Sequence, residues 1–86
     1  MSHLSTLNDL MYFNSFFGGY HPSDIDDTDG VNPKYFGFVD KEGNWYILQL
    51  HETNGALRYA KGENDYITNW TNRATLIYDY FHNIFS

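Results

Sequence analysis

The sequence contains no cysteine and few basic residues, and each shortage excludes a class of protein. Without cysteine the chain has neither a disulfide framework nor a thiolate metal site. Five Lys and Arg residues stand against eleven Asp and Glu residues, which gives a formal net charge of −6. Clustered cations are what bind nucleic acid and anionic lipid, so we expect neither nucleic acid nor a membrane as a partner.

Long apolar runs and closely spaced histidines are lacking as well. No apolar stretch approaches the ~20 residues of a membrane-spanning helix. The N-terminal residues lack the basic and then apolar pattern of a signal peptide. The four histidines lie far apart in the sequence, which disfavours a zinc site. We therefore expect no signal peptide, no bound metal and no cofactor.

Aromatic residues, by contrast, make up 20% of this 86-residue chain. A domain of this size buries only roughly 60–65% of its unfolded surface, so its core is small. Small domains without disulfides often gain stability by oligomerising, and interfaces are enriched in aromatic side chains. We expect a single domain with some rings in an interface between copies. The alternative is an aromatic-rich core with half-exposed tyrosines.

The pattern over residues 35–61 predicts a three-stranded antiparallel β-meander. Three apolar runs form its strands, at residues 35–39, 45–51 and 57–61. The first turn ends at Gly43 and is typical of a type I turn followed by a left-handed glycine. Asn54 and Gly55 form the second turn and are typical of type I′.

The segments on either side of the meander are expected to be helices joined to it by an acidic loop. Residues 2–17 have helical apolar spacing, and residues 18–34 contain both prolines and predict a loop. Residues 68–85 predict a second helix, with Thr68 or Asn69 as N-cap and a strand over residues 76–80 as the alternative. The apolar positions of this helix are four and three residues apart, at Trp70, Ala74, Ile77, Phe81 and Ile84.

The predicted fold is therefore α+β, with a three-stranded antiparallel β-meander packed against a C-terminal helix and with an N-terminal helix. Residues 1–34 form the N-terminal helix and the acidic loop, and residues 35–86 form the meander and the C-terminal helix, within one domain overall.

Both faces of the central strand are apolar, because Tyr46 and Leu48 alternate with Trp45 and Ile47. We expect the C-terminal helix to cover the Tyr46 side. The other side, or an open edge of the meander, is expected to meet the N-terminal helix or another chain. The candidate interface residues are Trp45, Ile47, Tyr35, Tyr59, Phe16 and Phe17. The candidate structural residues are Gly43, Gly55, Trp70, Arg73 and Phe81.

The acidic run at residues 24–29 was compared with the EF-hand calcium loop. When Gly30 is aligned with the sixth position, Ile25 and Phe36 occupy the first and twelfth, where calcium requires oxygen ligands. The EF-hand interpretation fails. A looser aspartate-rich cation site and a solvated loop with Asx-turns both remain open.

No catalytic set is recognisable in the sequence. His51 lies beside Glu52, and Asp79 lies three residues before His82. We expect both pairs to make surface hydrogen bonds only, because acid–base catalysis also needs a pocket and a second partner. The rings of Trp45, Tyr46, Tyr35 and Tyr59 could stack on a sugar or a peptide. The alternative is that these rings lie in the core or in a subunit interface, and this alternative is favoured.

Two stretches of the chain resemble a pattern in short virion proteins of tailed bacteriophages. The first is Tyr35-Phe36-Gly37-Phe38-Val39-Asp40-Lys41-Glu42-Gly43-Asn44-Trp45-Tyr46-Ile47. The second comprises Tyr59-Ala60-Lys61-Gly62, Trp70-Thr71-Asn72-Arg73-Ala74, Leu76 and Tyr78. The resemblance covers about residues 33–86 and rests on turn and core positions.

The resemblance implies a structural role in many copies within a phage particle, after synthesis in the host cytoplasm. The partners would be copies of the chain itself or other virion proteins of the tail, neck or capsid. Arg73 would then be structural, paired with Asp65 or Asp79. Two other hypotheses remain: a module that binds a glycan or peptide on its aromatic sheet face, and an acidic phage-encoded inhibitor of a host protein. An enzyme is the least expected class.

Overall fold

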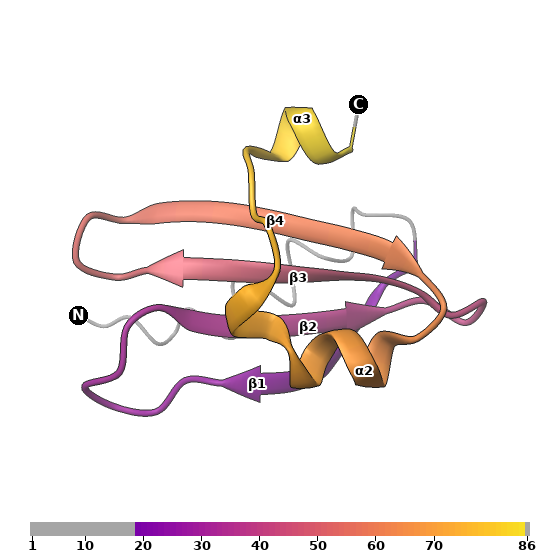
Figure 1. The fold of residues 1–86 in the computed structure, drawn as a ribbon, viewed down its shortest axis with the longest axis horizontal. Coiled ribbons are helices and arrows are strands. Elements are labelled where there is room, and N and C mark those ends of the chain that lie inside the picture. The colour runs from indigo at the N-terminus through magenta and orange to yellow at the C-terminus, as the bar shows by residue number, and fades with distance from the viewer. Residues whose placement is uncertain (1–18, 86) are drawn as a thin grey trace.

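The computed structural model describes residues 19–85, which form a four-stranded antiparallel sheet followed by short helical segments (Figure 1). The strands are β1 His21–Asp26, β2 Lys34–Val39, β3 Asn44–His51 and β4 Ala56–Glu63, and they lie in that order in the sheet. The helical segments are α2 Tyr66–Thr71, the 3-10 helix η1 Arg73–Thr75 and α3 Phe81–Ile84. The class is α+β, as expected. The predicted N-terminal helix, with Phe16 and Phe17, lies outside the described residues.

The three predicted strands are found as β2, β3 and β4, and the turn between β2 and β3 has the expected geometry. The Gly43 N–H donates to the Asp40 carbonyl at 3.1 Å, and Gly43 has a φ of 92°. The second turn differs from the prediction. Residues 52–55 separate β3 from β4, and Gly55 has a positive φ of 73° whereas Asn54 does not. A type I′ turn needs a positive φ at both central residues, so that prediction is wrong.

The predicted loop over residues 18–34 contains a strand, β1, which the sequence analysis missed. It pairs antiparallel with β2, with Ile25 opposite Phe36, and its register shifts between Pro22 and Asp24. Aspartate and proline are depleted in strands, so local propensity does not predict β1. β1 covers the edge of β2 that the three-stranded prediction left open.

Each face of the sheet carries its own apolar cluster, as the alternation along β3 predicted. We call the side that carries Trp45 and Ile47 the Trp45 face, and the side that carries Tyr46 and Leu48 the Tyr46 face. The buried cluster on the Trp45 face consists of Tyr35, Trp45, Ile47, Ala60 and Tyr66. The buried cluster on the Tyr46 face consists of Phe36, Phe38, Tyr46, Leu48 and Tyr59. The sheet is therefore the middle layer of the fold.

The long C-terminal helix predicted over residues 68–85 is wrong. The chain forms α2 and η1, becomes extended at Leu76 with φ −74° and ψ 160°, and forms the single turn of α3. Between η1 and α3, Asp79 makes an isolated antiparallel bridge with Tyr59 on the outer edge of β4. The alternative prediction of a strand over residues 76–80 is closer to this extended stretch, although it makes a single bridge to β4 among the described residues.

The C-terminal segment instead crosses the edge of the sheet and contributes to both faces. Trp70, Leu76 and Tyr78 pack on the Trp45 face, while Ile84 and Phe85 pack on the Tyr46 face. Figure 1 shows α2 lying in front of the sheet and α3 beyond the outer edge of β4. We expected the whole helix on the Tyr46 face. The expectation fails because the apolar residues of this segment serve two surfaces rather than one helical stripe.

Candidate interaction surface at the outer edge of β4

The predicted interface residues of the Trp45 face are buried within the chain. Trp45 is only 4% exposed, and Ile47 and Tyr35 are buried beside it. The Trp45 indole N–H donates to the Asn64 carbonyl at 2.9 Å, and the centre of its ring lies 6.4 Å from that of Tyr66. These residues leave no open ring on which a sugar or peptide could stack. The hypothesis of an aromatic binding face therefore loses its basis.

Tyr59, the predicted interface residue of β4, is also buried, but on the Tyr46 face. Its ring makes edge contacts with Phe81 and Phe85, at centroid distances of 5.2 Å and 5.9 Å. Phe81 was expected to be structural, and it lies against Tyr59 in this way. The position of Tyr59 follows from the strand alternation, since its partner Leu48 belongs to the same face.

Two aspartates of the acidic run fasten the C-terminal segment to β1. Asp24 accepts a hydrogen bond from the Tyr66 hydroxyl at 2.8 Å. Asp26 forms an ion pair with Arg73, whose Nη2 lies 2.9 Å from Oδ2. Arg73 therefore pairs with neither Asp65 nor Asp79, contrary to the expectation. The side chains of β1 alternate, so both carboxylates fall on the Trp45 face, where α2 and η1 pack.

The acidic run therefore has a structural use that its sequence did not reveal. Within residues 19–85 no cluster of three or more His, Asp or Glu side chains could hold a metal ion. Hydrogen bonding to the Asp24 carboxylate and, above all, burial raise the pKa of Tyr66. The hydroxyl thus stays a hydrogen-bond donor to Asp24 throughout the neutral pH range.

In neither acid–histidine pair seen in the sequence does a hydrogen bond join the acid to the histidine. His51 contacts the Gln49 amide oxygen at 3.0 Å, while the Glu52 carboxylate lies 3.3 Å from the ammonium of Lys34. Asp79 accepts a bond from the Tyr80 N–H at 2.7 Å, which is the main cause of its lowered pKa.

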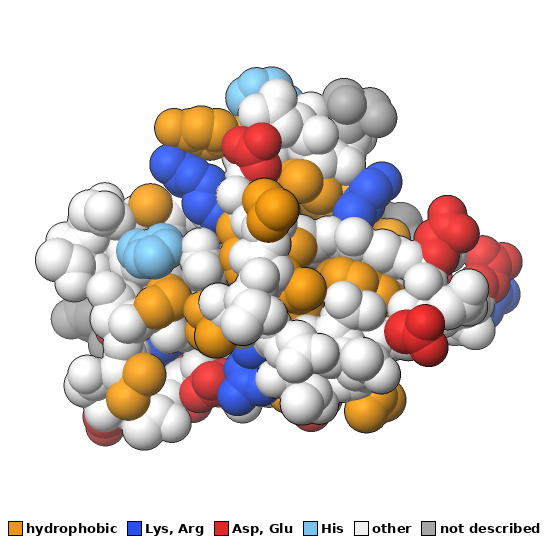
Figure 2. All heavy atoms as spheres, viewed as in Figure 1, with side chains coloured by type: hydrophobic (Ala, Val, Ile, Leu, Met, Phe, Trp, Pro, Cys, Tyr) orange, Lys and Arg blue, Asp and Glu red, His pale blue; other side chains and the backbone are white. Residues whose placement is uncertain are grey.

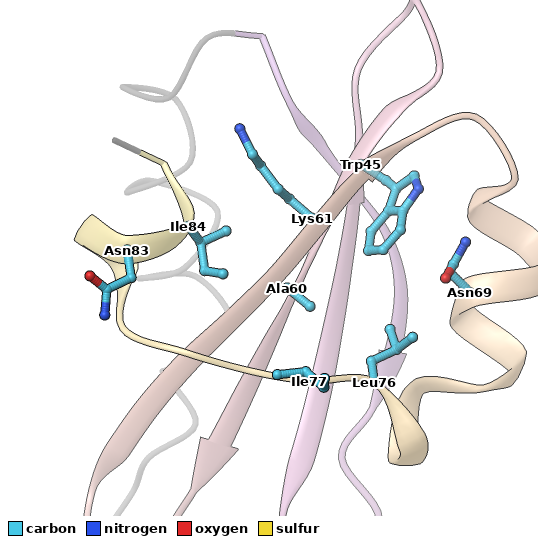
Figure 3. A pocket seen from close by; sticks show the side chains of 8 residues that line it. All are labelled: Trp45, Ala60, Lys61, Asn69, Leu76, Ile77, Asn83 and Ile84. Carbon is cyan, nitrogen blue, oxygen red and sulfur yellow. The ribbon is translucent and has the colours of Figure 1, made fainter.

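A hollow of about 330 Å³ lies where the C-terminal segment crosses β4. It is lined by Trp45, Ala60, Lys61, Asn69, Leu76, Ile77, Asn83 and Ile84 (Figure 3). An indole ring, aliphatic carbons, two amides and one ammonium group surround it, and none of its described lining residues is a carboxylate or a histidine. The hollow is suited to apolar and hydrogen-bonding contact rather than to proton transfer.

The outer edge of β4 beside this hollow has unpaired backbone groups. The bridge between Tyr59 and Asp79 turns the Tyr59 N–H and C=O away from β3, with hydrogen bonds of 2.8 Å and 3.0 Å. Backbone groups alternate sides along a strand, so those of Lys61 and Glu63 also point outward. Within residues 19–85 they have no hydrogen-bond partner. Sequence reasoning noted open edges but did not single out these two residues.

Exposed apolar side chains lie near this edge. Ile77 is 88% exposed and is one of the residues that line the hollow. Tyr80 is also exposed, and the guanidinium carbon of Arg58 on β4 lies 3.9 Å from the centre of its ring. Figure 2 shows orange side chains gathered among blue side chains on this side of the molecule. The edge of β4 and its surroundings are the candidate interaction surface.

Comparison of the chain with models of protein families, with curated proteins and with solved structures found no match. Within residues 19–85, no helix has the length and apolar character needed to cross a bilayer.

Proposed function

We propose that the protein is a non-catalytic assembly protein of a phage particle, which works by contacts with copies of itself or with other virion proteins. The observation that carries this proposal is the outer edge of β4, which has outward-facing backbone groups at Lys61 and Glu63 beside the hollow. Sheet edges of this kind recruit another strand.

Three further properties support an assembly role over a catalytic one. Most of the described aromatic residues lie in or against the two core clusters. The acidic residues of β1 bind the C-terminal segment. The hollow has no carboxylate or histidine among its described lining residues. The phage setting rests on the resemblance over about residues 33–86, in which Gly43 occupies a turn and most of the aromatic residues lie in the core.

The test is the composition of purified phage particles produced from the genome that encodes this chain. Quantitative mass spectrometry should detect the chain in the particles in several copies. A chain that is abundant in infected cells but missing from particles washed at high salt would contradict the structural role.

A further inference from the structure

We propose that the outer edge of β4 pairs antiparallel with the same edge of a second copy, with Lys61 of each chain opposite Glu63 of the other. The inference rests on the assembly role proposed above. The Lys61 and Glu63 N–H and C=O groups all point away from β3, and the described chain offers them no partner.

The backbone groups of β3 support the outward direction of the Lys61 and Glu63 groups. Tyr46 on β3 lies between Phe38 on β2 and Lys61 on β4, so its backbone groups can face only one of these two strands. Asn44, which is opposite Glu63, directs its N–H and its C=O to Asp40 instead. Antiparallel strands alternate hydrogen-bonded and non-hydrogen-bonded pairs, so Lys61 and Glu63 both belong to the set that faces away from β3.

The two charges on this edge are self-complementary. Lys61 and Glu63 are two residues apart and therefore lie on the same face of the strand. A second β4 running antiparallel about an axis through Gly62 places each ammonium opposite a carboxylate of the other copy. Directly opposite charges on neighbouring strands attract, and a two-fold contact repeats each pair. Each hydrogen-bonded pair of residues in this register exchanges two backbone hydrogen bonds.

This local charge balance decides for a second copy over an unrelated acidic or basic strand. The whole chain carries a formal charge of −6, so two copies repel each other over most of their surfaces. The β4 edge carries one cation, Lys61, and one anion, Glu63. In an antiparallel second copy each of them lies opposite a residue of the other charge. Gly62, at the centre, is required within the chain itself, because a Cβ there would lie 2.6 Å from Cζ2 of Trp45.

The surroundings of the edge favour a closed pair over a growing fibre. The Asp79 bridge occupies the edge at Tyr59, so the free stretch of β4 is short. In Figure 3 the Lys61 side chain points away from α2. The opposite edge of the sheet, β1, has an irregular register at Pro22, which lacks an N–H to donate. Proline and bulges are known protections of an edge against further pairing.

The experiment is a charge reversal with rescue, read by sedimentation velocity on the full-length chain over a wide concentration range. We expect a reversible dimer for the wild type. Lys61→Glu and Glu63→Lys each place like charges opposite one another twice, and each should raise the dimer dissociation constant about tenfold or more. The double variant K61E/E63K restores opposite charges in the same register and should return the dissociation constant to near the wild-type value.

Matched controls change the same charges on the β2–β3 hairpin. Lys41→Glu and Glu42→Lys alter the net charge identically at exposed positions outside β4, and they should leave the dissociation constant within about twofold. The Lys61 ammonium also lies 5.2 Å from the centre of the Phe85 ring, so the Glu63 variant guards against an effect on folding. Circular dichroism confirms that each variant is folded.

Two results would overturn the inference. One is a wild-type chain that stays monomeric at all concentrations. The other is an oligomer whose dissociation constant is unchanged by both charge reversals, or is not restored by the double variant. Neither result would touch the proposed function if the chain is still found in particles. A chain that dimerises as described but is missing from particles would leave this inference standing and remove the phage role.

Discussion

At the scale of single residues, Gly37 explains how the C-terminal segment lies so close to the sheet. It is a glycine in the middle of β2, a position where glycine normally weakens a strand. Here the Tyr66 side chain passes directly over it to reach Asp24 on β1. A Cβ at Gly37 would overlap the Tyr66 hydroxyl and would lie 3.0 Å from Cε3 of Trp70.

Gly37→Ala should therefore destabilise the protein by about 1–3 kcal/mol, which is the usual cost of overpacking a closely packed core. Tyr66→Phe alone should cost about 1 kcal/mol, because it removes the hydrogen bond to Asp24. The double variant should lose less than the sum of the two, since the hydroxyl is the atom nearest to the new methyl group. Urea denaturation measures all three, and strictly additive losses would contradict the proposed overlap.

Buried tyrosines set the response of the protein to alkaline pH. Burial is the main cause that raises the pKa of Tyr46, Tyr66 and Tyr78 above the usual value near 10. The unfolded chain releases these protons at a lower pH than the folded chain does. Their contribution to stability is complete below about pH 10 and is lost as the pH rises beyond it.

The urea midpoint should therefore fall steadily from about pH 10 upward, and the part of the tyrosinate absorbance that belongs to the buried tyrosines should appear together with the loss of circular dichroism. Tyr78→Phe removes one of the three groups and should make this fall less steep. A midpoint that is constant to pH 11, or ionisation of all the tyrosines while the fold persists, would show that these hydroxyls are not buried as described.

At the scale of elements, the sequence predicts those parts of the fold whose signals are local. The two turn glycines and the alternation along β3 were enough to place β2, β3 and β4 and to show that both sheet faces are covered. β1 was not predictable in this way, because Asp24 and Asp26 argue locally for a loop. Their long-range partners are Tyr66 and Arg73, which lie 42 and 47 positions later in the sequence.

The prediction of a helix over the C-terminal segment failed for a different physical reason. The spacing of Trp70, Ile77 and Ile84 fits one face of a helix, but the fold distributes these residues over three environments. Trp70 packs on the Trp45 face, Ile84 on the Tyr46 face, and Ile77 is almost fully exposed. No local signal reports that a segment crosses a sheet edge, because the crossing is stabilised by the distant Tyr59. For the same reason the candidate surface at Lys61 and Glu63 was not predicted.

The ion pair between β1 and η1 gives a test of this arrangement with a close control. Asp26→Asn should destabilise the fold by about 1 kcal/mol, since it breaks a partly exposed pair with two hydrogen bonds to one guanidinium. Asp27→Asn changes the neighbouring exposed residue and should stay within about 0.5 kcal/mol of the wild type. Equal effects of the two changes in urea denaturation would argue against the register of β1.

At the scale of the whole molecule, the protein is a layered fold whose β4 edge is self-complementary. The sheet is covered on both sides, and the C-terminal segment that covers it also limits how much of β4 stays open. A contact of that size is weak, so the dimer should depend on concentration. Its charges should also make it weaken as salt is added, because screening acts on exposed ion pairs.

Ile77 is expected to add an apolar contact to the backbone hydrogen bonds of the dimer, because its exposed side chain lines the hollow next to the edge of β4. Ile77→Ser should leave the free energy of unfolding within about 0.5 kcal/mol and should weaken the dimer. Ile67→Ser changes another exposed isoleucine on α2, outside the hollow, and should leave the dimer unchanged. Sedimentation velocity distinguishes the two variants, and identical behaviour would show that the hollow is not part of the contact.

The most direct test of the central claim is the solution mass of the wild-type chain by sedimentation equilibrium from micromolar to near-millimolar concentration. We expect a reversible rise from 10.1 kDa for the monomer toward about twice that mass, with no larger species. A mass that stays at 10.1 kDa throughout this range, or that rises without limit, would contradict a closed dimer formed at the edge of β4.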